Sequence, residues 1–442
     1  MKKSFVFVAL SLSLISLQAL AISFGSFDPR THAMGGVGVA SGDASNANYF
    51  NPALLAMTQD EDDFSLVIPT IGVGLTDPDK LVDKLDSYDN ANYEQALDAT
   101  INKFNATGSS GNPAGYVTTA SEVARASQNL LTAIQNFSNN TLGLDANAGV
   151  LIAVPSKTLG VSVAATGRLV ASGLINVTSA DINLVQSYIN VLNCIGALDS
   201  GSATLPDVLS CDDSNNIIND TTGAFNNTNT TATLSSSIKL RGAIVKEISV
   251  SFARKFSSLD DVAIGITPKS VNVETYDYSV TLETADIDAD QGKRSYSDAN
   301  LDIGAAKNLT EKIKVGLVGK NIFSKEYTTV LGNTVKIEPQ LRTGIAYQND
   351  WALIAVDLDL TKNKGVGFTE DTQYIAAGIE FDAFDTFQLR AGYRHNLKSN
   401  SNISSGLPSL GIGLSPFGVH IDVSVANNDD ELQAGLQLGL KF

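Results

Sequence analysis

Few side chains in this 442-residue sequence are spaced for catalysis. His32, His395 and His420 are isolated from one another, and no His-Glu-x-x-His pattern or Cys/His cluster brings metal ligands onto one face of an element. No Gly-x-Ser-x-Gly motif offers an activated serine nucleophile. The sequence therefore predicts no enzymatic activity, no catalytic residue and no cofactor.

One acidic segment resembles the beginning of a calcium-binding loop. Asp286, Asp288 and Asp290 alternate as the first ligands of such a loop do, but the positions that need glycine and glutamate hold Gln291 and Ser297. We interpret the segment as a solvated acidic loop that binds divalent ions loosely if it binds them, and we predict no metal site.

Charged side chains recur at alternate positions in several segments whose other face is apolar. Because successive residues of a strand point to opposite faces, such segments would turn apolar residues to lipid and charged ones to a barrel lumen. The residues expected in the lumen are Lys336, Glu338, Arg342, Asp357, Asp359, Arg390, Arg394 and Asp422, while Val335 and Ile337 would face lipid. Two interpretations remain open: ion pairs that fill the lumen and hold a plug, or a path for substrate.

Segments of period two continue from Phe64 to the chain end, with turn residues between them. The last, Leu432 to Phe442, alternates strictly and ends on an aromatic residue, as a closing barrel strand does. About fourteen such segments are present, among them Thr334 to Gln348, and short connections mostly alternate with long ones. The sequence predicts an all-β protein, a transmembrane antiparallel β-barrel over residues 63–442.

Composition and the N-terminus agree with an exported membrane barrel. Met1-Lys2-Lys3, an apolar run and Ala19-Leu20-Ala21 form a secretory signal over residues 1–21, so the mature chain should begin near Ile22. Mean hydropathy is only +0.05, because apolar residues are interleaved with polar ones. The formal charge of -17 makes nucleic acid a poor partner. We expect an outer-membrane location, with outer-membrane lipid, lipopolysaccharide and the barrel-assembly machinery as partners.

Two long excursions interrupt the strands and are expected outside the membrane. Residues 77–142 have helical spacing, which could cap the barrel mouth, bind a hydrophobic ligand, or pack on itself as a small external subdomain. Residues 178–233 are polar and hold both cysteines. Because the chain is exported, we predict a solvated loop with a Cys194–Cys211 disulfide.

The most distinctive motif runs from Met34 to Met57. It is rich in glycine, including Gly35 and Gly36, and ends near Asn51-Pro52, a turn signal. From the residues alone, a flexible N-terminal segment is one interpretation. The block also resembles the N-terminal signature of the FadL-like outer-membrane barrels, and other pieces, such as residues 267–269, 355–359 and 389–394, are similar to the conjugal transfer protein TraF family.

This resemblance implies both a fold and a function. Residues 22–62 would form a hatch that plugs the lumen, with Gly35, Gly36, Asn51 and Pro52 as gating positions. The implied function is uptake of a hydrophobic small molecule. The alternative is a non-transporting envelope component, either a surface scaffold or part of a conjugation or secretion apparatus.

Overall fold

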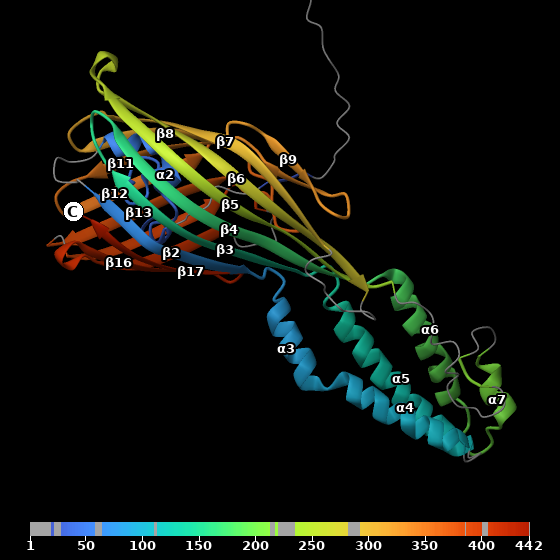
Figure 1. The fold of residues 1–442 in the computed structure, drawn as a ribbon. Coiled ribbons are helices and arrows are strands. Elements are labelled where there is room, and N and C mark those ends of the chain that lie inside the picture. The colour runs from blue at the N-terminus through green and yellow to red at the C-terminus, as the bar shows by residue number, and fades with distance from the viewer. Residues whose placement is uncertain are drawn as a thin grey trace, which may run out of the picture.

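Fourteen antiparallel strands close into a barrel in the computed structural model (Figure 1). The structure describes residues 19–21, 28–57, 64–109, 113–212, 217–219, 235–281, 292–384, 386–399 and 405–441. Residues 1–18 of the predicted signal, the acidic segment 286–291 and Phe442 lie outside these ranges. The barrel strands are β2 (Ser65–Thr76), β3 (Thr141–Val154), β4 (Gly160–Asn176), β5 (Ser237–Phe256), β6 (Val262–Thr281), β7 (Lys293–Asn308), β8 (Ile313–Lys320), β11 (Gln340–Gln348), β12 (Ala352–Asp359), β13 (Tyr374–Ala383), β14 (Phe387–Asn396), β15 (Gly406–Leu414), β16 (Val419–Asn427) and β17 (Glu431–Lys441).

The barrel closes between its last strand and its first. β17 pairs with β2 in antiparallel register, from Glu431 opposite Thr76 to Lys441 opposite Ser65. Outward-facing residues of the wall are apolar and exposed, as at Ile248 (62 %) and Leu410 (60 %), whereas their neighbours in sequence point into the lumen. A closed barrel with this outer surface spans a membrane, since every strand is paired and lipid meets apolar side chains. The predicted outer-membrane barrel is confirmed.

No helix in the described part of the chain is both long and apolar enough to cross a membrane.

One predicted strand is wrong. The stretch from Thr334 to Gln348 divides into β10 (Thr334–Ile337) and β11, because Pro339 cannot donate to a strand ladder. β10 pairs with β9 (Lys325–Thr328), and the short β1 (Ala19–Ala21) lies parallel to β10.

This β9–β10 hairpin folds into the lumen. Val335 and Ile337, expected to face lipid, are buried instead. They pack with Tyr327 against inward-facing residues of β5 and β6, namely Ala243, Val245, Val271 and Val273. Their apolar character therefore comes from packing against the inner wall.

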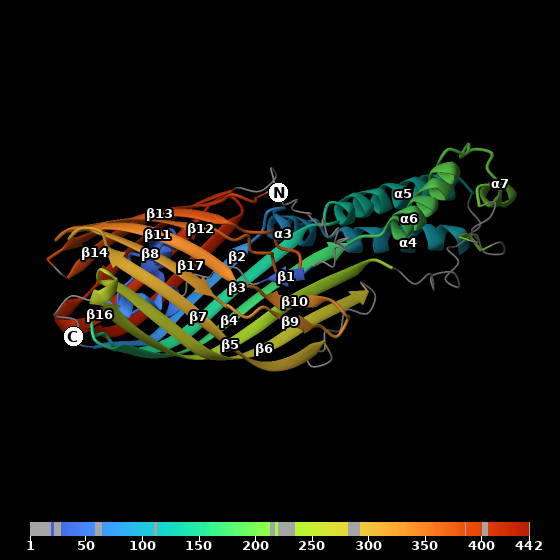
Figure 2. The same ribbon diagram turned by 90° about the horizontal axis from the view of Figure 1, so that it is seen from above.

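Five helices project from the end of the barrel opposite the C-terminus (Figures 1 and 2). We call this group the helical arm: α3 (Leu81–Ala91), α4 (Tyr93–Ser109), α5 (Pro113–Gln135), α6 (Ser179–Gly196) and α7 (Leu205–Ser210). Helices α4, α5, α6 and α7 pack on one another around Phe104, Val123, Leu192 and Ile195. The expected disulfide joins Cys194 to Cys211. The arm thus includes part of residues 178–233, which we had expected to be a solvated loop.

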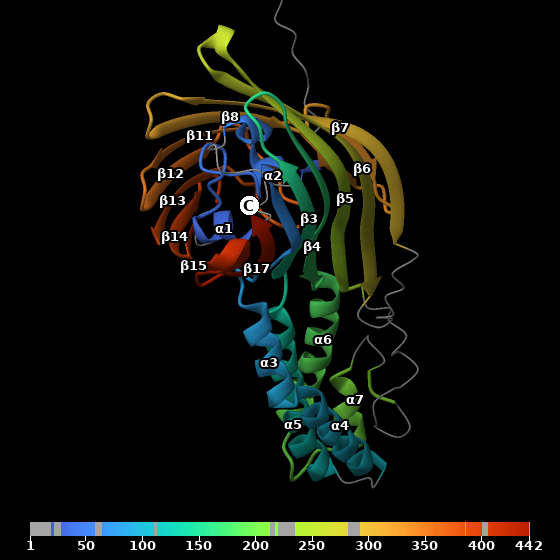
Figure 3. The ribbon, with the colours of Figure 1, turned by 60° about the vertical axis from the view of Figure 1, so that its left-hand side comes forward.

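A short N-terminal segment occupies the lumen. Residues 28–57, here called the hatch segment, contain α1 (Pro29–Ala33), α2 (Ala47–Phe50) and the 3-10 helix η1 (Pro52–Ala56). All of these residues are buried or half-buried. Seen toward the barrel end, α1 and α2 lie inside the ring of strands (Figure 3). The flanking parts of the predicted hatch, residues 22–27 and 58–62, lie outside the described ranges.

Candidate functional site

The glycine turn of the hatch segment fits closely against β14. Gly35 and Gly36 have φ angles of +76° and +90°, which favour glycine. A Cβ at Gly35 would lie 2.8 Å from the backbone oxygen of Tyr393. The Gly35 amide donates to Oγ of Ser409 on β15 at 3.0 Å. Only a residue without a side chain fits this turn.

Asn51 connects the other end of the hatch segment to the wall. It is fully buried, and its Nδ2 donates to the carbonyls of Val39 at 2.9 Å and of Ala305 on β7 at 3.1 Å. Its Oδ1 accepts from the amide of Ala53 and so caps η1, in which Pro52 is the first residue. A single amide side chain therefore joins two parts of the hatch segment to one barrel strand.

Asp357 and Arg342, both expected in the lumen, bind the backbone of the hatch segment between Gly36 and Val39. Asp359, also expected there, pairs with Arg342. Oδ2 of Asp357 accepts from the amides of Gly38 at 2.8 Å and Val39 at 3.0 Å. Arg342 donates to the carbonyl of Gly36 at 3.2 Å and pairs with Asp359 at 2.5 Å. These contacts are polar and backbone-directed, and they fix the position of the glycine turn.

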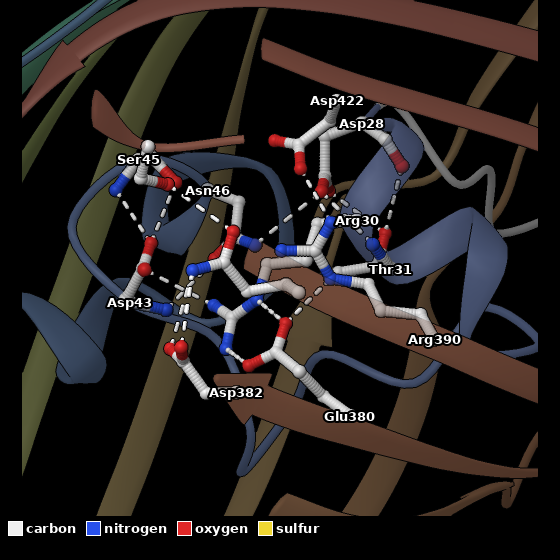
Figure 4. Close-up of polar contacts among 12 residues, drawn as sticks. Asp28, Arg30, Thr31, Asp43, Ser45, Asn46, Glu380, Asp382, Arg390 and Asp422 are labelled. Carbon is white, nitrogen blue, oxygen red and sulfur yellow. Dashed lines mark hydrogen bonds and ion pairs between the residues drawn. The ribbon is translucent and has the colours of Figure 1, made fainter. Parts of the chain in front are cut away.

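A buried ion-pair cluster holds α1, as Figure 4 shows. We call Arg30, Asp43, Glu380, Arg390 and Asp422 the latch cluster. Arg30 donates from Nε and Nη2 to the two carboxylate oxygens of Glu380, both at 2.8 Å, and pairs with Asp43 at 3.0 Å. Arg390 binds the same Glu380 at 2.5 Å and also pairs with Asp422. The cluster links the hatch segment to β13, β14 and β16.

The other residues expected in the lumen are placed differently. Arg394 pairs with Glu431 at 3.0 Å and lies 4.7 Å from the ring centre of Tyr374, beside a cavity. Lys336 lies on the inserted hairpin, where it pairs with Glu326, and Glu338 follows that hairpin half-buried. We had placed Lys336 and Glu338 on a barrel strand, and the break at Pro339 explains the error.

Sequence reasoning missed the hatch side of the latch cluster. Asp43 lies within the Met34–Met57 motif, but that motif assigns it no partner, and Arg30 precedes the motif with no periodic pattern to mark it. Glu380, in contrast, sits on the polar face of an alternating strand, so the rule that identified Arg390 would also have identified it. Their pairing could not be predicted, because Arg30 and Glu380 are 350 residues apart.

A cavity of about 210 Å³ adjoins the hatch segment on the side of the helical arm. Asp28, Pro29 and His32 of the hatch segment form part of its lining. Other lining residues come from β2, β3, β4, β14, β17 and the connection between β12 and β13. Among the described residues, no group of three or more His, Cys, Asp or Glu side chains could hold a metal ion.

Comparisons with known proteins bear on the family and on the fold. A family model described as "F plasmid transfer operon, TraF, protein" matches residues 48–359. No curated protein matches the chain.

Several solved structures are similar at low identity. The Pseudomonas putida toluene transporter TodX has a TM-score of 0.49 and 10 % identity, covering 95 % of this chain and 99 % of TodX. A Pseudomonas aeruginosa FadL homologue has a TM-score of 0.47 and 9 % identity, covering 96 % of this chain and 99 % of its own. The Ralstonia pickettii toluene transporter TbuX has a TM-score of 0.34 and 11 % identity, covering 97 % and 100 %.

Proposed function

The chain belongs to the TraF family of the F plasmid transfer operon, and we propose that it is an outer-membrane channel whose hatch segment gates the uptake of a hydrophobic small molecule. The observation that carries this proposal is the latch cluster, in which a few ion pairs join a segment in the lumen to three wall strands. The FadL-like block from Met34 to Met57 supports the hydrophobic substrate class. Gly35, Gly36, Asn51 and Pro52 are the proposed gating positions.

Two properties of the hatch segment support gating. The hatch segment lies in the lumen and contributes no strand to the barrel, so its displacement leaves the strand pairing intact. Many of the contacts that hold the hatch segment in place are hydrogen bonds and ion pairs to side chains of the barrel wall, including Asp357 and Glu380. Water can replace polar contacts of this kind, which lowers the net cost of breaking them. The proposal includes no catalytic step, and lipid, lipopolysaccharide and the barrel-assembly machinery remain the proposed partners.

Native mass spectrometry tests the substrate class. The mature protein would be purified in several mild detergents, and the same samples would be extracted for lipids. We expect a bound hydrophobic molecule that is lost on denaturation. An empty barrel in every detergent would contradict uptake of a hydrophobic molecule.

The helical arm favours a second candidate function, a non-transporting component of a conjugation or secretion apparatus. The arm extends away from the barrel (Figure 1). It has its own apolar core and is crosslinked by a disulfide. An extended helical surface of this kind suits protein partners better than it suits a small solute. Crosslinking of envelope proteins to the intact chain, lost when the arm is replaced by a short linker in a barrel that still folds, would support this function. Equal crosslinking of both forms would contradict it.

A further inference from the structure

The connection between β12 and β13 enters the lumen as a short hairpin. We call residues 362–373 the lumen loop. At its base, Asn363 and Thr372 exchange backbone hydrogen bonds of 2.8 and 2.7 Å. The side-chain amide of Asn396 on β14 donates to the carbonyl of Asp371 at 3.0 Å. The base of the lumen loop is therefore fixed to the strands from which it leaves.

The tip of the lumen loop binds the opposite side of the wall. Oγ of Ser172 on β4 accepts from the Phe368 amide at 2.7 Å and donates to the Val366 carbonyl at 3.1 Å. The guanidinium of Arg241 on β5 lies 4.9 Å from the ring centre of Phe368. In the closed ring of strands, β13 and β4 are seven strands apart in either direction. The lumen loop therefore crosses the bore from one side to the other.

The part of the wall that receives the tip is held by polar contacts of its own. Arg241 pairs with Asp277 of β6 at 3.2 Å. Oδ2 of Asp277 also accepts from Oγ1 of Thr329 at 2.6 Å and from Nδ2 of Asn333 at 2.7 Å, both in the turn of the β9–β10 hairpin. The lumen loop thus meets a braced surface. Lifting the tip breaks its hydrogen bonds to Ser172 and leaves this surface in place.

The cavity beside the hatch segment lies between that segment and the lumen loop. Val366 and Phe368 line it from the loop, and His32 lines it from the hatch segment. Val170 of β4 also lines it, one inward-facing position from Ser172 toward the hatch segment. A solute that moves from the side of the helical arm to the hatch segment therefore passes the apolar tip of the lumen loop first.

The tip fits the wall too closely for a side chain at Gly367. This residue has a φ of +69°, and a Cβ there would lie 2.1 Å from Oγ of Ser172 and 3.0 Å from Cβ of Arg241. Glycine adopts this φ without steric cost, whereas other residues are strained by it. A methyl group at Gly367 would therefore push the tip away from the wall.

We propose that the lumen loop is the size filter of this channel. Held against Ser172, the loop divides the bore between the helical arm and the cavity. Ions and small solutes pass beside it, whereas a bulky solute requires the tip to leave the wall. The apolar side chains of Val366 and Phe368 at this point suit a hydrophobic solute. The inference rests on the proposed uptake function and adds a limit on the size of the solute.

Thiol labelling of a reporter cysteine tests the filter. Val170→Cys places a thiol on the hatch side of the lumen loop, and it is the only free thiol, because both cysteines of the chain form the Cys194–Cys211 disulfide. The detergent-purified protein would be treated with N-ethylmaleimide, which is small, or with a maleimide that carries a polyethylene glycol chain, and each rate would be normalised to that with free cysteine. Because the bulky reagent requires the tip to lift, the hydrogen bonds to Ser172 should slow it at least about tenfold relative to the small one.

Two variants in the reporter protein should release the tip. Gly367→Ala forces a methyl group against Ser172, and Ser172→Ala removes both hydrogen bonds. Each should speed the bulky reagent roughly tenfold and leave the rate of the small one nearly unchanged. The matched controls are Gly332→Ala, at φ +84° with no atom within 4 Å of the added Cβ, and Ser270→Ala, at an exposed residue of β6. Both controls should react as the reporter protein does.

Two results would overturn the filter. One is equal labelling of the reporter protein by the small and the bulky reagent. The other is labelling of both tip variants by the bulky reagent at the rates of the controls; a lower melting temperature of these variants would then show that the loop only braces the barrel. If one tip variant fails to fold, the other decides.

The labelling does not depend on release of the hatch segment, so the two proposals fail separately. An absent size dependence would refute the filter and leave gating by the hatch segment in place. A Glu380→Gln barrel whose hatch amides stay protected, together with the expected labelling, would refute gating and keep the filter.

Discussion

Replacing Glu380 by glutamine should release the hatch segment from the wall. Glu380 is the carboxylate shared by Arg30 and Arg390, and the variant keeps its shape but removes its charge. Breaking a buried ion pair by neutralising one partner costs about 3–5 kcal/mol. Here Asp43 still pairs with Arg30 and Asp422 with Arg390, so we expect the lower end, about 3 kcal/mol.

Amide hydrogen exchange followed by mass spectrometry measures this release. The amides of Gly35, Gly38 and Val39 donate to wall side chains, so their exchange requires the hatch segment to leave the wall. A loss of about 3 kcal/mol corresponds to exchange that is roughly 100-fold faster. The strand amides of the barrel should keep their protection, because the wall is unchanged.

The matched control is Glu122→Gln in the helical arm. Glu122 pairs with Lys103 at 2.6 Å, but the lysine side chain is 56 % exposed. An exposed pair contributes about 0–1 kcal/mol, so the control should leave the hatch amides unchanged. Hatch exchange in a folded Glu380→Gln barrel that equals exchange in the control would refute the role of the latch cluster.

Three further predictions follow from other parts of the structure. Gly35→Ala places a methyl group against the backbone of Tyr393 at a φ of +76°, so it should speed hatch exchange as the Glu380 variant does, whereas Gly332→Ala, at an open position with φ +84°, should not. Burial would raise the pKa of Asp181, but hydrogen bonds from Ser236 and Ser235 outweigh it and lower the pKa to about 2; the contribution of Asp181 is complete above about pH 4 and is lost as the pH falls toward 2. Limited proteolysis of the arm should therefore accelerate in that window, and Asp181→Asn should remove the pH step. Cys211→Ser opens a loop with a sequence separation of 17 and should destabilise the arm by about 3 kcal/mol while the barrel keeps its melting behaviour. If Cys211→Ser destabilised the barrel together with the arm, that result would contradict an arm that packs on its own core.

Alternation in single strands predicted the barrel and much of its lumen. Arg342, Asp357 and Arg390 were assigned to the inner face because their neighbours are apolar, and that pattern depends only on local sequence. The pattern fails where two different environments, lipid and an apolar inner wall, both favour apolar residues at alternate positions. Val335 and Ile337 alternate as lipid-facing residues do, yet they pack on an inner wall, which is also apolar.

Contacts between distant segments could not be predicted from the sequence. The pairing of Arg30 with Glu380 depends on how the hatch segment enters the closed barrel, which no local pattern specifies. The connection between β12 and β13, residues 362–373, shows the same limit, since its largely polar composition is equally typical of an external connection, yet Ser172 of β4 bonds its backbone at Val366 and Phe368. Helix α6 was also not predicted. Many of its residues are polar, so we expected a solvated loop there although Leu192 and Ile195 are spaced as on one face of a helix.

Single-channel recording in a planar bilayer tests gating most directly. The unchanged protein should be closed for most of the recording, and Glu380→Gln should show frequent openings of larger conductance, with Glu122→Gln behaving as the unchanged protein does. A Glu380→Gln barrel that remains closed although its hatch amides exchange rapidly would contradict the claim that the hatch segment is the gate.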